Sequence, residues 1–122
     1  MKYMRLRHKY NAVPSNRDNI KFPSKLERDC YDVLKDYKTS KNIRFFLRQI
    51  PFDIPGSAKH NVDFEVFTHG GVYFVEAKGR DLAMGKLKRL QVEEIYDIDI
   101  HVVTTPTELK TLLNKWIKEE RE

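Results

Sequence analysis

Apolar residues recur with two different periods along the chain, and these periods predict its elements. Over residues 24–37 they return at helical spacing, which predicts an amphipathic helix with one buried stripe. The stripe consists of Leu26, Cys30, Val33, Leu34 and Tyr37. Residues 43–50 are rich in β-branched and aromatic side chains and predict a strand, and the prolines and glycine of residues 51–57 predict a turn after it.

A β-hairpin is predicted over residues 61–79. Apolar and polar side chains alternate in both halves, and Thr-His-Gly-Gly between them is typical of a tight turn, because glycine supplies the positive φ that such turns require. Residues 82–96 then predict a helix with an inward-facing apolar stripe. This stripe consists of Leu82, Leu87, Leu90 and Ile95.

The last part of the chain predicts one strand and one helix. Residues 98–105 predict a strand, because apolar side chains alternate at Ile98, Ile100 and Val102, as in a half-buried strand. Thr105 is a good N-cap, Pro106 fits the first helical position and Glu108 completes a capping box, so a final helix begins there. Its acidic end, residues 119–122, is expected to be exposed to solvent.

These elements follow one another in the order α-β-β-β-α-β-α. We therefore expect an α/β fold in which helices flank a mixed four-stranded sheet, in one domain over residues 22–122. Residues 1–21 are a basic segment before this domain, and we expect an arm that follows a phosphate backbone. Its cations are Lys2, Arg5, Arg7, Lys9, Arg17 and Lys21. A frayed terminus with solvated charges is the alternative.

Charge and composition narrow the class of protein. Of the 122 residues, 23 are Lys or Arg and 18 are Asp or Glu, and the net charge of +5 suits a polyanionic partner. The single cysteine, Cys30, excludes an internal disulfide and a cysteine-rich zinc site. We find no signal peptide and no apolar run of about 20 residues, so we expect a cytoplasmic protein that has no membrane partner.

Polar side chains stand at the end of the predicted hairpin. With a loop of two or four residues, Asp63 faces Glu76 on one side of the sheet, whereas a three-residue loop breaks this register. Facing carboxylates repel unless a cation lies between them, and Lys78 or a divalent metal could supply it. For Mg²⁺, the two acids and the carbonyl oxygen of Ala77 could form half of a coordination shell. The simpler alternative is a solvated ion pair between Glu76 and Lys78.

Two further groups have two interpretations each. Glu27 follows Ser24 by three residues and fits a capping box, but in the first helical turn it could also point toward the acids of the hairpin. Lys86, Lys88 and Arg89 lie next in sequence to the acids, where they could contact phosphates or form a solvated helix face.

The order of these residues resembles a known nuclease superfamily. A helix with Glu27 precedes a strand with Asp63, and Glu-x-Lys at residues 76–78 stands on the next strand, before a helix and a strand. This order resembles the PD-(D/E)XK nucleases. Within that superfamily, residues 22–104 resemble phage endonuclease I, a family of Holliday junction resolvases, in four motifs. These are F-x-S-x-L-E from Phe22, PFDIP from Pro51 with His60 after it, FVEAKG from Phe74 and DIDIHVV from Asp97.

The resemblance implies a restriction-endonuclease-like core and a metal-dependent DNA endonuclease. It implies that Asp63, Glu76 and the Ala77 carbonyl bind Mg²⁺, which Mn²⁺ can replace. Glu27 would complete the acidic cluster, and Lys78 would position the attacking water. The substrate would be branched DNA, such as a four-way junction in the cytoplasm of a phage host. A homodimer would cut it, because resolution needs two cuts related by symmetry.

Two alternatives stay open. Another nuclease of the same fold could cut transposon ends, single-stranded flaps or invading DNA, because a fold does not fix the substrate. A catalytically silent DNA-binding module would use the same acids as a structural set of salt bridges with Lys78.

Overall fold

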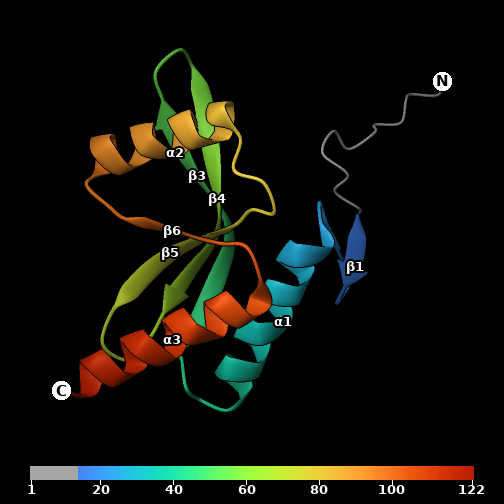
Figure 1. The fold of residues 1–122 in the computed structure, drawn as a ribbon, viewed down its shortest axis with the longest axis vertical. Coiled ribbons are helices and arrows are strands. Elements are labelled where there is room, and N and C mark those ends of the chain that lie inside the picture. The colour runs from blue at the N-terminus through green and yellow to red at the C-terminus, as the bar shows by residue number, and fades with distance from the viewer. Residues whose placement is uncertain (1–13) are drawn as a thin grey trace.

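The computed structural model describes residues 14–122 (Figure 1). From the first helix onward, the element order matches the one predicted. The elements are β1 (Ser15–Arg17), β2 (Ile20–Phe22), α1 (Lys25–Thr39), β3 (Phe45–Ile54), β4 (Ala58–Phe67), β5 (Val72–Ala77), α2 (Ala83–Tyr96), β6 (Ile100–Val103) and α3 (Pro106–Arg121). The fold is therefore α/β, as expected. Within residues 14–122, no helix is both long and apolar enough to cross a membrane.

The main sheet is mixed and has the strand order β3-β4-β5-β6. β3, β4 and β5 are antiparallel neighbours, and β6 joins β5 in parallel after the crossover through α2. Figure 1 shows α2 at one end of the long β3–β4 hairpin and α1 and α3 at the other. Val75 and Ala77 pack in the cluster beneath α1 and α3, whereas Phe74 packs in the cluster beneath α2. Because successive strand residues point to opposite faces, the helices cover both sides of the sheet.

The predicted starts of α1 and α3 are confirmed. The Ser24 hydroxyl accepts a hydrogen bond from the N–H of Glu27 at 3.1 Å, and Thr105 accepts one from Glu108 at the same distance. Pro106 occupies the first turn of α3. Both starts were predictable because a cap is satisfied within four residues of chain.

Two boundaries differ from the prediction. The strand expected to end at Ile50 continues to Ile54, so the turn lies at residues 55–57 instead of 51–57. Pro51 is tolerated inside it because β3 is the edge strand of the sheet, where a missing N–H leaves no second neighbour unpaired. The hairpin strand expected from residue 61 begins earlier, at Ala58, because its first residues pair with the extended part of β3.

The expected orientation of α2 is wrong. Three side chains that should face inward are exposed by half or more; these are Leu87, Leu90 and Ile95. The helix instead buries Arg89 and Val92. The Arg89 guanidinium holds the Asp81 carboxylate through two hydrogen bonds of 2.8 and 2.7 Å. The face that α2 turns to the sheet is the one with Val92, which packs in the cluster with Val62 and Ile100, and with Arg89, whose Nη1 lies 3.7 Å from Glu76 on β5.

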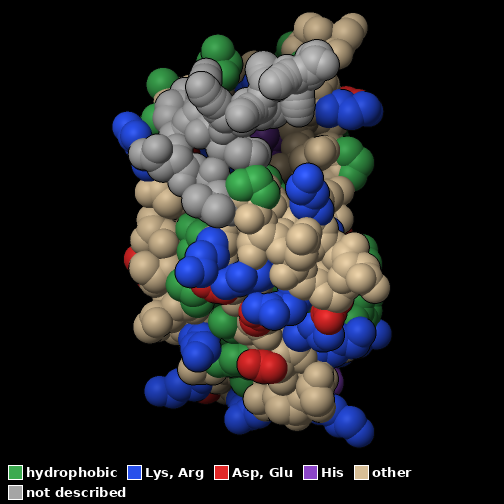
Figure 2. All heavy atoms as spheres, turned by 90° about the vertical axis from the view of Figure 1, so that its right-hand side faces the viewer, with side chains coloured by type: hydrophobic (Ala, Val, Ile, Leu, Met, Phe, Trp, Pro, Cys, Tyr) green, Lys and Arg blue, Asp and Glu red, His purple; other side chains and the backbone are tan. Residues whose placement is uncertain are grey.

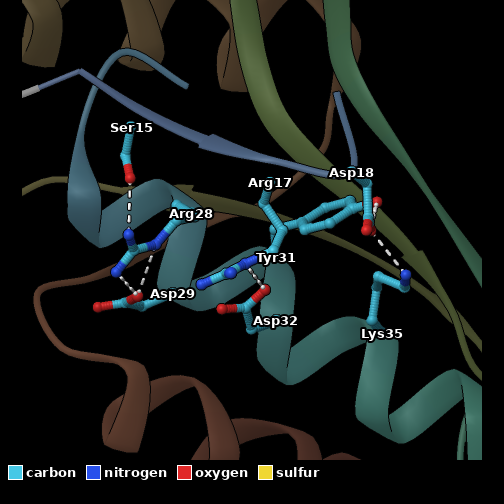
Figure 3. A network of polar contacts seen from close by, with 8 residues as sticks. All are labelled: Ser15, Arg17, Asp18, Arg28, Asp29, Tyr31, Asp32 and Lys35. Atoms are coloured by element: carbon cyan, nitrogen blue, oxygen red, sulfur yellow. Dashed lines mark hydrogen bonds and ion pairs between the residues drawn. The ribbon is translucent and has the colours of Figure 1, made fainter. Parts of the chain in front are cut away.

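The end of the segment expected to be an arm is a small hairpin. β1 and β2 pair through a two-residue turn at Asp18 and Asn19, both with positive φ, as tight hairpins require. Figure 3 shows how this hairpin is fixed to α1: Asp18 accepts bonds from Tyr31 at 2.9 Å and from Lys35 at 2.6 Å. Arg17 also bonds Asp32. Residues 14–21 are therefore a docked hairpin and not a free arm.

The turn between β4 and β5 is held by α3 and not by glycine conformation. Gly70 and Gly71 lack a positive φ, contrary to expectation. The Glu120 carboxylate instead accepts hydrogen bonds from the Thr68 hydroxyl, the Gly70 N–H and the Tyr73 hydroxyl, at 2.6, 3.1 and 2.6 Å. The acidic end of the chain, expected to be wholly exposed, thus supplies one partly buried structural contact.

Candidate functional site

Asp63 lies where β4 and β5 separate. The predicted register is confirmed, since Phe67 pairs with Val72, and the last paired position is Phe64 with Val75. One step further along, the Asp63 carboxylate accepts a hydrogen bond from the backbone N–H of Ala77 at 2.9 Å. Beyond the last pair of the two strands, an acidic side chain and not a backbone carbonyl therefore accepts this backbone N–H.

Gln49 connects Asp63 to α1. It stands on β3 opposite Asp63, at a gap in an otherwise continuous run of pairs, with a φ of 53°. Its side-chain amide donates to Glu27 at 2.9 Å and to Asp63 at 3.3 Å. The left-handed backbone at Gln49 thus accompanies a bridge between two acids that lie 36 residues apart in the sequence.

The side chain of Glu27 makes its contacts within the site and not in the capping box. Its backbone N–H completes the cap on Ser24, but its buried carboxylate accepts hydrogen bonds from Gln49 and, at 3.4 Å, from Arg48. The Arg48 guanidinium also lies 4.5 Å from the ring centre of Phe22. Burial raises the pKa of Glu27, and the nearby charge of Arg48 acts against this shift.

Burial also raises the pKa of Asp63, to about 7. The negative charge of Glu27 adds to the shift, whereas the Ala77 N–H and the positive charge of Lys78 oppose it. At neutral pH the two linked acids therefore carry less than two full negative charges. Such a pair is prepared to accept a proton or a cation.

Glu76 is completely buried and belongs to a second set of contacts. One carboxylate oxygen bonds the ring of His60. The other has no hydrogen-bond partner, although Nη1 of Arg89 lies 3.7 Å away. The structure therefore links Glu27 to Asp63 through Gln49 and holds Glu76 in a separate group of contacts. In the part of the chain described, no three His, Cys, Asp or Glu side chains already converge as a metal site.

Lys78 follows β5 directly and is half-buried. Its backbone N–H donates to the carbonyl oxygen of Val103 at 2.9 Å, which continues the pairing with β6. Its charge lowers the pKa of both Glu27 and Asp63, so the ammonium lies near the linked acids. The solvated ion pair between Glu76 and Lys78 is not what forms, because Glu76 is buried with His60 and Arg89.

The residues expected to contact DNA fall into three groups. Lys2, Arg5, Arg7 and Lys9 lie outside the described residues. Lys86 is exposed and Lys88 is half-buried on α2, so solvent reaches both side chains. Arg89 is buried with Asp81 and Glu76, so its expected place on the surface is wrong. Figure 2 shows further Lys and Arg side chains over the face of the molecule that lies to the right in Figure 1.

Sequence reasoning missed three residues of the site: Gln49, Arg48 and the contact role of His60. A signal existed for Gln49, because it is a polar side chain inside the run of residues 43–50 and, once β3 and β4 are paired, it faces Asp63. No local signal existed for the contact of His60 on β4 with Glu76 on β5, since both residues lie beyond the last pair of these two strands, Phe64 with Val75.

Chemically, the arrangement combines buried acids of raised pKa, one carboxylate oxygen without a hydrogen bond and an ammonium group beside them. Such a set can hold a cation and orient a water molecule. Comparisons of the chain with protein-family models, with curated proteins and with solved structures found no match.

Proposed function

We propose that the chain is a metal-dependent DNA endonuclease with a restriction-endonuclease-like core of the PD-(D/E)XK type. One observation carries the proposal: one residue beyond the last pair of β4 and β5, the Asp63 carboxylate accepts the hydrogen bond of the Ala77 N–H, and Gln49 joins the same carboxylate to Glu27. Lys78 directly follows β5, and its positive charge acts on both acids. An acidic pair and a lysine, converging from α1, β4 and β5, are a costly arrangement that a purely structural role does not require.

The residues present fit a divalent cation. Asp63 and Glu76 would hold it, with the Ala77 carbonyl and Glu27 as further oxygen ligands, and such ligands suit Mg²⁺ and Mn²⁺. Burial raises the pKa of Asp63 and of Glu27, and one oxygen of the buried Glu76 carboxylate lacks a hydrogen bond. A bound cation would stabilise the charged form of all three carboxylates. When bound, the ion would stabilise negative charge on the scissile phosphate and acidify the attacking water.

The protein's own side chains would divide the remaining work. Lys78 would orient the attacking water by a hydrogen bond and stabilise negative charge near the phosphate. Gln49 would hold Glu27 and Asp63 at a fixed separation through its two hydrogen bonds. His60 and Arg89 would fix the Glu76 carboxylate, because they contact its two different oxygens.

DNA would be held mainly through its phosphates. Lys86 and Lys88 stand on the helix that follows the site, and the net charge of +5 favours a polyanion. We propose branched DNA, such as a four-way junction, as the substrate, on the motifs from Phe22 to Val103 that resemble phage endonuclease I. Two symmetric cuts would then require a homodimer. Nucleases of the same fold that act on other DNA structures are the nearest rivals.

A silent DNA-binding module is the second candidate. The observation that favours it is the pairing of Glu76 with His60 and its proximity to Arg89, since a carboxylate with two cationic or polar neighbours can be purely structural. In that case the acids would bind no metal and DNA would be bound without being cut.

Cleavage of two labelled DNA molecules tests the proposal. The purified chain is incubated with a four-way junction and with a linear duplex of matched sequence, in Mg²⁺ or EDTA. We expect paired, symmetric nicks in the junction alone, dependent on Mg²⁺ and absent in Asp63→Ala and Lys78→Ala. Equal cutting of the duplex would keep the nuclease and reject the junction. Binding of both molecules without cutting, in Mg²⁺ and in Mn²⁺, would favour the silent module.

A further inference from the structure

Arg48 has fewer hydrogen-bond acceptors around it than its guanidinium has donors. A guanidinium carries N–H donors on each of its nitrogens. Within residues 14–122, its one hydrogen bond runs from Nη2 to Oε2 of Glu27 at 3.4 Å, and its buried Nε has no partner. Bonds between a guanidinium and a carboxylate normally measure about 2.7 to 2.9 Å, so the contact with Glu27 is a loose one.

Aromatic rings hold the guanidinium of Arg48 in place. Its central carbon lies 4.5 Å from the ring centre of Phe22 and 6.0 Å from that of Tyr31. Phe22 ends β2 and is fully buried, and its ring contacts that of Tyr31 with centroids 5.0 Å apart. A cation over an aromatic face is stabilised without the use of its N–H groups. The docked hairpin of β1 and β2 therefore positions Arg48 and leaves its donors available to another acceptor.

The guanidinium stands beside the acids of the site and is partly open to solvent. Glu27, which it contacts, is joined through Gln49 to Asp63. The side chain of Arg48 is 22% exposed, whereas that of Glu27 is 4% exposed. A ligand that approaches these acids from solvent can therefore reach Arg48 as well.

We propose that Arg48 binds the DNA phosphate that lies at the acids Glu27 and Asp63. The inference rests on the proposed function, which supplies the DNA and its place at these acids. Arginine pairs with phosphate oxygens in a planar arrangement of two hydrogen bonds, and such oxygens would be the acceptors that Arg48 lacks. The contact would also offset the repulsion between the phosphate and the acids, because a positive charge then lies close to both.

The rival role for Arg48 is that of a counter-ion for Glu27 alone. In that role its loss would change DNA binding only through the position or charge of Glu27. A phosphate contact instead acts on DNA directly and adds to the salt dependence of binding, because each contact releases counterions from the DNA. The two roles therefore differ in what happens when Glu27 itself is replaced.

Fluorescence anisotropy of a labelled four-way junction tests the phosphate contact. All proteins carry Lys78→Ala, so that the DNA stays uncut, and binding is measured in Mg²⁺ and in EDTA. Arg48→Gln should weaken binding in Mg²⁺ about tenfold or more, because it removes hydrogen bonds to a charged group. The slope of log K against log salt should fall in magnitude by about 0.9, as for one lost phosphate contact. Arg48→Lys should bind with intermediate affinity, because it keeps the charge and loses the planar fork.

Arg44→Gln is the matched control for the loss of charge. Arg44 directly precedes β3, is exposed, and has its guanidinium 5.7 Å from the ring centre of Phe45. Its replacement removes the same charge and should leave the affinity and the salt slope close to those of the parent. Circular dichroism and urea unfolding show whether each variant keeps its fold. Equal affinities of Arg48→Gln and Arg44→Gln in both solutions would overturn the inference.

A second set of proteins repeats the comparison with Glu27→Gln. Arg48→Gln should still weaken DNA binding there, because the phosphate contact does not pass through Glu27. A loss of affinity that disappears in the Glu27→Gln background would overturn the phosphate contact and leave Arg48 as a counter-ion.

Failure of this inference and failure of the nuclease proposal give different results. If the wild type takes up no metal and cuts no DNA, while Arg48→Gln still weakens binding, the nuclease proposal falls and the phosphate contact stands. If the wild type cuts the junction, while Arg48→Gln binds it as Arg44→Gln does, only the phosphate contact falls. A parent protein that binds no DNA would overturn both.

Discussion

Gln49 shows how one residue can hold a site together at a cost to its own backbone. A non-glycine residue at a φ of 53° is strained by about 1 to 3 kcal/mol. Its side-chain amide donates to Glu27 and Asp63, and these charge-assisted hydrogen bonds offset the strain. Strain of this kind is common where a fold must place a functional group.

Substitutions at Gln49 should separate backbone strain from side-chain contact. Gln49→Gly and Gln49→Ala both lose the bridge, but glycine also relieves the positive φ. We expect Gln49→Gly to be more stable than Gln49→Ala by about 1 kcal/mol in urea unfolding. Gln91 lies in α2 and is the matched control, because alanine should be the more stable replacement inside a helix. Equal stability of the two Gln49 variants would mean that the backbone there is not strained.

Asp63 makes the stability of the protein depend on pH. Its pKa in the fold is about 7, mainly because of burial, whereas an unfolded Asp titrates near 3.8. Between these values the folded state binds more protons than the unfolded state, so stability falls as the pH rises through that window and levels off above it. The slope is at most about 1.4 kcal/mol per pH unit for one group.

Asp63→Asn should reduce this slope and make the metal-free protein more stable than the wild type at pH 8. Part of the slope should remain, because burial also raises the pKa of Glu27. Urea unfolding at several pH values between 4 and 8 measures both effects. Asp53→Asn, an exposed acid paired with Lys59, is the control and should leave the slope as it is. A wild-type stability that rises from pH 5 to 8 would contradict the assigned pKa of Asp63.

At the scale of elements, the turn between β4 and β5 depends on α3. Glu120→Ala should lower the free energy of unfolding by about 1 to 3 kcal/mol, because it leaves the Tyr73 hydroxyl and the Gly70 N–H without their acceptor, whereas the Thr68 hydroxyl can still donate to the carbonyl oxygen of Gly71. Chemical unfolding measures the change. Glu119→Ala removes the neighbouring exposed carboxylate and should change the stability by less than about 0.5 kcal/mol. Similar losses in both variants would show that general charge, and not this contact, is what matters.

Sequence reasoning succeeded for elements whose causes are local. Ser24 and Thr105 fix helix starts within a few residues, and the loop at residues 68–71 has a length that fixes the register of Asp63 and Glu76. It failed for β3, because whether Pro51 can sit in a strand depends on that strand being at the edge of the sheet.

The orientation of α2 could not be predicted because its apolar stripe has two possible uses. Periodicity shows that Leu87, Leu90 and Ile95 share a side, but it does not say what that side meets. The buried side is the one on which Val92 packs against strand residues and Arg89 approaches Glu76 on β5, and both contacts join segments that periodicity alone does not bring together. For the site, strand alternation predicted that Asp63 and Glu76 stand on the two hairpin strands, with Lys78 close after them. Gln49 and His60 make their contacts at positions where the strand pairing is interrupted or has ended, which alternation does not predict.

At the scale of the whole molecule, different surfaces carry different tasks. The acids lie where α1, β4 and β5 meet, and Lys and Arg side chains are spread over the face shown in Figure 2. The side of α2 that carries Leu87 and Leu90 is apolar and exposed.

The most direct test of the site is calorimetric titration of the metal-free protein with Mn²⁺ at pH 8. The wild type should take up the ion, whereas Asp63→Asn and Glu76→Gln should each lose most of the affinity, because each removes a charged ligand. Asp53→Asn, which changes an exposed acid on β3, should bind as the wild type does. No uptake by the wild type, or equal uptake by all four proteins, would contradict a metal site at Asp63 and Glu76.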